Sequence, residues 1–272
     1  MRDPEKTPQK RFRLFFDVIG IVFLLSVLKL GIHWYGLELL TLNSLFTSAI
    51  AAAVFLIGFL LSGVLADYKE ADRLPTDIRV ALESIFDDTR SFTATKGING
   101  DAIRQKLLGI VNGLQIALSE TAGKDLRPVL TNVDSLTENF SGLEAAGMPP
   151  NYIVRLRSEQ ATLRRSIFRI YHMQRIQFVP SVHVLVQTLV LANVLLLLFL
   201  KTEGSPESAL IFGAISYMFI YALYLVSTLE QPFRKRRQSF DDVSLFLLRE
   251  FAEKLTSGDS DAKEAGRVYS QS

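Results

Sequence analysis

The chain has 272 residues, of which 49% are hydrophobic and 21% are charged, and its mean hydropathy is +0.23. This is high for a soluble protein with 30 basic and 28 acidic residues, and it indicates that apolar runs and charged helices occupy different parts of the chain. The formal net charge of +2 gives nucleic-acid binding no electrostatic support. The absence of cysteine excludes disulfides, thiolate nucleophiles and cysteine-ligated metals.

Four apolar runs each approach the roughly 20 residues that a helix needs to cross a bilayer. They cover Leu14–Trp34, Leu45–Ala66, Val182–Leu200 and Ala209–Leu229. Only the first contains formal charges, Asp17 and Lys29, and it lacks the cleavage site of a secretory signal, so we expect it to be retained. The sequence therefore predicts an all-α membrane protein with four transmembrane helices in two hairpins around a helical cytoplasmic block.

Basic residues predict the orientation of these hairpins, because cytoplasmic loops of membrane proteins are enriched in Lys and Arg. The N-terminal tail and the segment after the fourth run are basic, whereas the loop from Tyr35 to Ser44 contains no Lys or Arg. Both termini are therefore predicted to be cytoplasmic. The expected organisation is a basic tail at 1–13, a transmembrane hairpin at 14–66, a cytoplasmic helical domain at 67–179, a second hairpin at 180–229, and a cytoplasmic basic segment with a disordered tail at 230–272.

Two lysines, Lys29 and Lys201, lie toward the predicted outer face. We expect their ammonium groups to snorkel to the interface; the alternative is that they attract anions to an outer mouth.

The central domain is expected to consist of helices separated at Pro75 and at glycine-containing turns. Either Asn99 or Asp101 is expected to cap a helix that runs to about Glu120, and no segment has the period-2 pattern of a strand. Apolar residues at 3–4 spacing predict the buried faces of two helices. These residues are Ile103, Leu107, Ile110, Leu114 and Leu118, and then Val129, Val133, Leu136, Phe140 and Leu143.

The last predicted helix of this domain, from about Asn151 to Phe178, carries six arginines and a single acidic residue, Glu159. One interpretation is a basic lining for an inner vestibule that concentrates anions. Its candidate residues are Arg155, Arg164, Arg165 and Arg169. The alternative is a solvated face with the ordinary cytoplasmic charge bias, in contact with anionic lipid headgroups.

Short motifs lie within and just after the second run and directly after the fourth. Phe55, Gly58 and Phe59 form a Phe-x-x-Gly-Phe segment, and Leu74–Pro75 closes the charged stretch after it. The sequence LEQPF, at Leu229–Phe233, follows the fourth run. The first motif resembles the second transmembrane helix of bestrophins, and the other resembles their Asn-Pro-Phe signature. The chain is most similar to the bestrophin-like bacterial proteins.

This resemblance implies an oligomeric ion channel in a bacterial inner membrane, with five subunits around an axis lined by the second transmembrane helix. The face that would line it has 3–4 spacing. It comprises Ser48, Ala51, Phe55, Phe59 and Ser62. Rings of phenylalanine would form a hydrophobic neck that can gate by dewetting, although the first neck position, bulky in bestrophins, is Ala51 here. The resemblance implies conduction of anions such as chloride, although some bacterial relatives favour cations.

The resemblance also implies that the partners are lipids, permeant ions and further copies of the chain, without a cofactor. Calcium-sensing bestrophins have acidic residues after Pro-Phe, where this chain has Arg234–Arg237, so we predict no calcium site of that type. The sequence has no HExxH, GxSxG or P-loop motif, and we expect no enzymatic activity.

Two other functions remain open at this stage. One is a non-conducting membrane anchor or scaffold whose cytoplasmic helices bind a partner. It differs from a channel in that Phe55 and Phe59 would face lipid or another helix rather than an axial cavity. The other is an alternating-access transporter, which the absence of strongly interrupted apolar runs disfavours.

Overall fold

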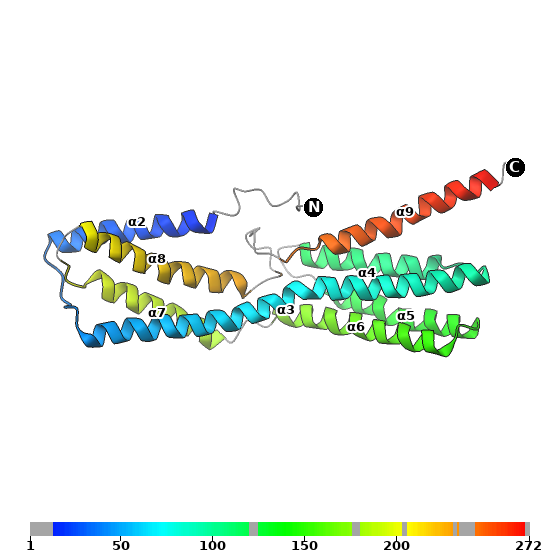
Figure 1. Cartoon of the computed structure of the whole chain (residues 1–272), viewed down its shortest axis with the longest axis horizontal. Helices are drawn as coiled ribbons and strands as arrows, with labels where there is room; N and C mark the ends of the chain where they lie inside the picture. Colours follow the sequence, from blue (N-terminus) through cyan, green and yellow to red (C-terminus); the bar gives the residue numbers. More distant parts are fainter. Residues whose placement is uncertain are drawn as a thin grey trace. The chain divides into compact units, whose positions relative to one another are not determined.

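The computed structural model describes residues 13–119, 125–175, 180–202, 206–230, 233 and 243–269. Within these ranges the chain is helical, apart from connecting segments and an isolated backbone bridge between Leu40 and Leu200 (Figure 1). The helices are α2 (Arg13–Trp34), α3 (Ser44–Lys96), α4 (Asp101–Ser119), α5 (Arg127–Ala145), α6 (Pro150–Arg175), α7 (Pro180–Leu198), α8 (Pro206–Leu229) and α9 (Phe246–Tyr269). The predicted all-α class is confirmed.

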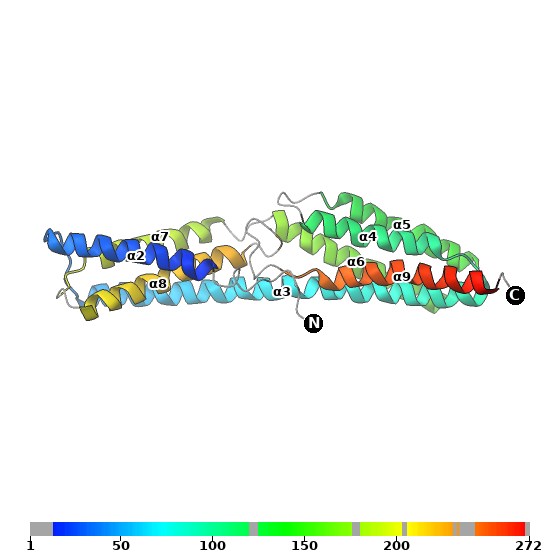
Figure 2. The same ribbon diagram turned by 90° about the horizontal axis from the view of Figure 1, so that it is seen from above.

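The helices group into two compact units that share α3. One unit, which we call the membrane unit, contains α2, α7, α8 and the part of α3 up to Lys69. The other, the helical block, contains α4, α5, α6, α9 and the part of α3 from Glu70 onward. The two views in Figures 1 and 2 show the members of each unit lying side by side. Each unit is therefore built from segments that are far apart in the sequence.

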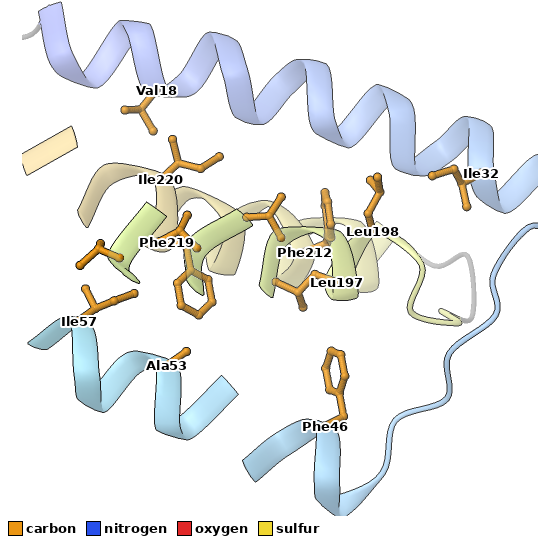
Figure 3. Close-up of a cluster of buried hydrophobic side chains, with 13 residues drawn as sticks. Val18, Ile32, Phe46, Ala53, Ile57, Leu197, Leu198, Phe212, Phe219 and Ile220 are labelled. Atoms are coloured by element: carbon orange, nitrogen blue, oxygen red, sulfur yellow. The ribbon is translucent and has the colours of Figure 1, made fainter. Parts of the chain in front are cut away.

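Buried apolar side chains join all four helices of the membrane unit. Figure 3 shows those of α2, α3, α7 and α8 pointing into a shared core. The core comprises Val18, Ile32, Phe46, Ala53, Ile57, Val186, Val190, Val194, Leu197, Leu198, Phe212, Phe219 and Ile220. Three of the helices, α2, α3 and α8, are long and apolar enough to cross a membrane, whereas the described apolar part of α7, Val184–Leu198, is shorter. Four membrane crossings therefore remain a prediction.

Helix α3 runs without interruption for 53 residues and contains Pro75 in its interior. The expected break at Pro75 is therefore wrong. Proline removes one backbone hydrogen bond and crowds the preceding turn, at a cost of about 3 kcal/mol in a helix interior. Here Pro75 is itself buried, and it lies on a face with Ala71, Leu74, Ile78 and Leu82, which are also buried. Packing of this face stabilises the helix through the proline, as is common for helices in folded proteins.

The helical block confirms the two predicted amphipathic faces. The residues at 3–4 spacing on α4 and α5 are all buried, and the two helices pack against each other. Helix α4 begins at Asp101, and of the two expected caps it is the Asn99 side chain that accepts a hydrogen bond from the Asp101 backbone N–H, at 2.8 Å. The spacing of apolar residues therefore placed the core of this unit correctly.

Helix α9 corrects the expectation of a disordered tail, because the chain is helical from Phe246 to Tyr269. Its first turns are anchored by Leu248, Phe251 and Leu255, which are buried at 3–4 spacing. The Phe251 ring lies edge to face with Phe86, at a centroid distance of 6.2 Å. These contacts fix the first turns of α9, on which the helix beyond them is built. Arg234–Arg237, which carry the calcium argument, lie outside the described residues.

Candidate pore face and outer clamp

The face of α3 that sequence spacing singled out is exposed along the membrane unit. Phe55 and Phe59 are 72% and 69% exposed, while Ala53 and Ile57, on the other side of the helix, are buried in the shared core. The exposed set, which we call the pore face, is Ser48, Ala51, Phe55, Phe59 and Ser62. A common exposed face is therefore present in the single chain, and its place in a pore stays a prediction.

Gly58, beside the pore face, has no close neighbour among the described residues. A Cβ atom added at Gly58 would meet no described atom within 4 Å. At Gly213 of α8, by contrast, an added Cβ would lie 3.8 Å from the Ser26 Oγ of α2. Gly58 therefore makes no close helix contact within the described chain, and this side of α3 is free for contact with something else.

The exposed side of α2 has a different composition from the pore face. It carries large apolar side chains such as Phe16, Phe23 and Leu24, which are 66%, 70% and 69% exposed. A uniformly bulky apolar surface suits lipid tails, whereas small and hydroxyl side chains suit close helix contacts and water. The two exposed helices of the membrane unit thus offer chemically distinct surfaces.

Lys29 corrects a sequence expectation. Its side chain is only 6% exposed, and its Nζ lies 2.7 Å from Glu38 Oε1, whose side chain is 8% exposed. The ammonium also donates a hydrogen bond to the carbonyl oxygen of Leu200. Lys29 therefore neither snorkels nor presents a free cation, because its charge is compensated by a carboxylate from the loop between α2 and α3. Lys201, in contrast, is exposed.

Glu38 is the centre of this cluster. Its carboxylate lies 3.1 Å from His33 Nδ1 and accepts hydrogen bonds from the Thr202 hydroxyl at 3.1 Å and the Thr202 backbone N–H at 3.3 Å. Burial raises the pKa of Glu38, but the hydrogen bonds from Lys29, His33 and Thr202 outweigh it and lower the pKa to about 2. The carboxylate is therefore charged at any physiological pH.

Backbone hydrogen bonds reinforce this cluster. The N–H groups of Leu39 and Leu40 both donate to the Phe199 carbonyl at 3.1 Å, and the Lys201 N–H donates to the Leu40 carbonyl at 2.7 Å. The α2–α3 loop is thereby tied to the end of α7. We call this arrangement the outer clamp. No motif in the sequence indicated the outer clamp, although Lys29 and Glu38 are the only Asp, Glu, Lys or Arg residues between Val18 and Ala66.

Two of the predicted vestibule arginines pair with acids of neighbouring helices. Arg155 Nε lies 3.3 Å from Asp88 Oδ2, and Arg164 Nη2 lies 2.6 Å from Asp134 Oδ1. Each guanidinium therefore has a local counter-charge, which weakens its field on a distant anion.

The other two differ from each other. Arg169 forms a two-pronged ion pair with Glu70, with N–O distances of 2.7 Å and 2.6 Å; these hydrogen bonds lower the pKa of Glu70. Arg165 is exposed, and it has no ion pair within the described part of the chain. The structure spreads the four arginines along α6 rather than gathering them, and their vestibule role stays a prediction.

Comparisons with protein-family models and with curated proteins find no match. Solved structures do match. One is a bacterial Bestrophin homolog from Klebsiella pneumoniae, with a TM-score of 0.72 and 17% identity over 89% of this chain and 96% of that one. A mutated form of it matches with a TM-score of 0.73 and 17% identity over 89% and 98% of the two chains. A further structure, described as a membrane protein, has a TM-score of 0.68 and 15% identity over 89% and 97%. The chain therefore has the bestrophin fold that its motifs predicted.

Proposed function

We propose that the chain is a subunit of an oligomeric ion channel whose permeation path runs along the pore face of α3. The observation that carries this proposal is the exposure of Phe55 and Phe59 within a face of small and hydroxyl residues. The opposite side of α3 is packed in the shared core, so the pore face is the side left for an axis between copies. The bestrophin fold supports this assignment.

Physical chemistry favours a neck at the two phenylalanines. Rings of apolar side chains one turn apart create a constriction that loses its water easily, and such a constriction can gate conduction. The edges of aromatic rings carry partial positive charge, which suits a partly dehydrated anion. No acidic residue lies on α3 between Ser44 and Ala66, so the neck lacks the carboxylate rings typical of cation channels. We therefore propose anions, such as chloride, as the permeant ions.

Ion flux through the purified protein in liposomes tests this function. The test variant is Phe55→Ala/Phe59→Ala, which removes the neck rings. The matched control is Phe16→Ala/Phe23→Ala on α2, where the replaced rings are 66% and 70% exposed. We expect wild-type protein to conduct chloride in preference to sodium. The neck variant should show a larger flux or lose its gating, whereas the α2 variant should behave like wild type.

Each outcome decides a separate part of the proposal. Equal effects of the two double variants would place the neck elsewhere. A preference for sodium would refute the anion assignment, but it would still support an ion channel. No flux above empty liposomes, from well-folded oligomers of all three proteins, would refute the channel and favour the membrane scaffold.

A further inference from the structure

The helical block contains a cavity at one end of the α4–α5 pair. Its volume is about 370 Å³, which is within the range of small-molecule sites in proteins. The lining residues come from the end of α3 and the turn after it, from the first two turns of α4, and from the last two turns of α5. All of these segments belong to the helical block.

Small side chains leave this space between α4 and α5. The two helices run antiparallel and touch closely at Gly113, where an added Cβ would lie 2.9 Å from Val129 Cγ2. The cavity, in contrast, is lined by Ala102, Gly142 and Ala146, and a Cβ added at Gly142 would meet no described atom within 4 Å. The helices are therefore held together at one end and leave room at the other.

Apolar side chains line part of the cavity. Ile103 of α4 and Leu143 of α5 are each 5% exposed, and Ile98, in the turn after α3, is 38% exposed. All three belong to the lining. A branched apolar group placed against them would be removed from water, which is favourable.

Two side chains of opposite charge line the same cavity. Lys106 is partly buried, and its Nζ donates a hydrogen bond to the Ser135 carbonyl oxygen at 2.9 Å. Two of its three N–H groups therefore have no partner among the described residues. Glu138 is exposed and makes no ion pair within the described part of the chain. Because Ser135 and Glu138 are three residues apart on α5, both charged groups lie on one side of that helix, close enough for one small ligand to span.

The amide of Asn139, on α5, also lines the cavity. Its Oδ1 atom is buried and accepts no hydrogen bond from any described residue. Buried polar atoms in folded proteins nearly always have a partner, so such an acceptor indicates a site for a donor from outside the chain. An ammonium group in the cavity supplies that donor once the amide turns toward it.

We propose that this cavity binds a small zwitterion, an α-amino acid with an apolar side chain. The Lys106 ammonium binds the carboxylate of the ligand, and Glu138 and Asn139 bind its ammonium group. The apolar lining takes up the side chain. Lys106 and Glu138 are the only base and the only acid of the described lining, so a ligand with a single charge would leave one of them without a counter-charge. This inference is independent of the proposed function.

Isothermal titration calorimetry on the purified full chain in detergent tests the site, with leucine, valine and phenylalanine as probes. Leucine should bind saturably, with one molecule per chain. Two analogues of leucine each lack one charged group: leucinamide has no carboxylate, and 4-methylpentanoate has no ammonium. Each should bind at least about tenfold more weakly than leucine, because it loses a charge-assisted hydrogen bond.

Substitutions assign each ligand group to its partner. Lys106→Met and Glu138→Gln should each lower the affinity for leucine by about ten- to hundredfold. Lys106→Met should not weaken leucinamide further, and Glu138→Gln should not weaken 4-methylpentanoate further, because the group that each residue binds is already absent. The matched control is Glu144→Gln, an exposed acid of α5 outside the described lining, which should bind leucine like wild type.

A bulky side chain in the cavity supplies a second measurement. Gly142→Leu should abolish leucine binding, whereas Ser141→Leu, at an exposed neighbouring position outside the described lining, should preserve it. Circular dichroism would show that both variants are folded.

Each outcome supports or overturns the site. Binding that is lost in Gly142→Leu and kept in Ser141→Leu would support it. No saturable binding of any of the three amino acids by the folded wild type up to ~10 mM would overturn it. Equal affinities for leucine and 4-methylpentanoate, or leucine binding that survives Gly142→Leu, would do the same. None of these outcomes depends on ion flux, so the site and the channel are tested independently.

Discussion

Lys29 and Glu38 show how a charge is accommodated in an otherwise apolar helix. Both side chains are more than nine-tenths buried, so each depends on the other for compensation. Removing one member of a buried pair leaves an unpaired charge and typically costs about 3–5 kcal/mol, whereas removing both costs much less. We expect Glu38→Gln to lower the thermal stability of the purified protein strongly. Lys29→Met/Glu38→Gln should recover part of the loss.

The double variant is the control for this prediction, since it removes the charges while keeping similar side-chain volumes. If it were less stable than Glu38→Gln by itself, the hydrogen bond from Lys29 to Leu200 would be more important than the ion pair.

The pKa of Glu38 adds a pH dependence to the same site. Its pKa falls from 4.5 to about 2 on folding, so the folded state binds its proton more weakly than the unfolded state. The stabilisation is complete above about pH 4.5 and is lost as the pH falls toward 2. Thermal unfolding of wild type and Glu38→Gln should therefore differ by a constant amount from pH 7 to 5 and converge below it. A difference that stayed constant down to pH 2 would show that it does not come from the charge of Glu38.

Single residues were predicted well where one helix decides their environment. Phe55 and Phe59 follow 3–4 spacing, and the structure places both on the exposed face. The prediction for Lys29 was wrong because its partners come from outside its own helix. Leu200 is 171 residues away, and Glu38 reaches Lys29 only when the intervening loop folds back. Local patterns carry no information about such contacts.

At the scale of elements, two glycines make a matched test of helix packing. A Cβ added at Gly113 of α4 would lie 2.9 Å from Val129 Cγ2 of α5, whereas one added at Gly142 of α5 would meet no described atom within 4 Å. Valine is stiff at χ1, so Gly113→Ala should cost about 1–3 kcal/mol through overpacking, against a gain of about 1 kcal/mol in helix propensity. Gly142→Ala brings only the gain in helix propensity, because the added methyl group meets no described atom.

Chemical or thermal unfolding followed by circular dichroism would measure both variants. We expect Gly113→Ala to lower the free energy of unfolding of the helical block and Gly142→Ala to raise it. Equal stabilisation by both would show that α4 and α5 can move apart enough to accept the methyl group.

Helix positions were predictable where apolar spacing and turn residues agreed. Helices α4 and α6 begin at or next to the expected glycine and proline turns, and the buried faces of α4 and α5 match the predicted pattern. Pro75 was mispredicted because a proline normally ends a helix, whereas the buried face around it stabilises α3 through this position. The first turns of α9 are held by tertiary contacts such as Phe86 with Phe251, which a local pattern does not contain.

For the whole molecule, the predicted membrane topology can be tested by labelling single cysteines in the cysteine-free chain. Suitable exposed positions are Thr41 in the α2–α3 loop, Lys201 after α7 and Ser141 in the helical block. An impermeant maleimide added to intact cells should modify Thr41→Cys and Lys201→Cys. It should reach Ser141→Cys only after the membrane is permeabilised, because α3 and α7 separate the loops from the block.

Permeabilised cells, in which all three positions should react, are the control. Labelling of Lys201→Cys and Ser141→Cys from the same side would show that α7 does not cross the membrane. Labelling of Ser141→Cys alone from outside would reverse the orientation.

The fold was predictable at this scale because apolar runs and short motifs are properties of one chain. The candidate site was predictable only as a helix face. The proposed pore would lie between copies, so its width, its ion preference and the number of subunits would depend on surfaces that a single sequence pattern does not distinguish from lipid contacts. The arginines illustrate the limit: sequence composition indicates a basic α6, but only the structure shows which guanidinium groups already have a partner.

The outer clamp also has a consequence for the order of events during synthesis. Domains emerge and fold from the N-terminus at about 5–20 residues per second, so Leu200 follows Lys29 after roughly 10 to 30 seconds. Glu38, only nine residues from Lys29, is made almost at once. The first hairpin therefore contains both members of the ion pair as soon as it is made. The Lys29 ammonium is compensated by Glu38 before the second hairpin is synthesised and completes the unit.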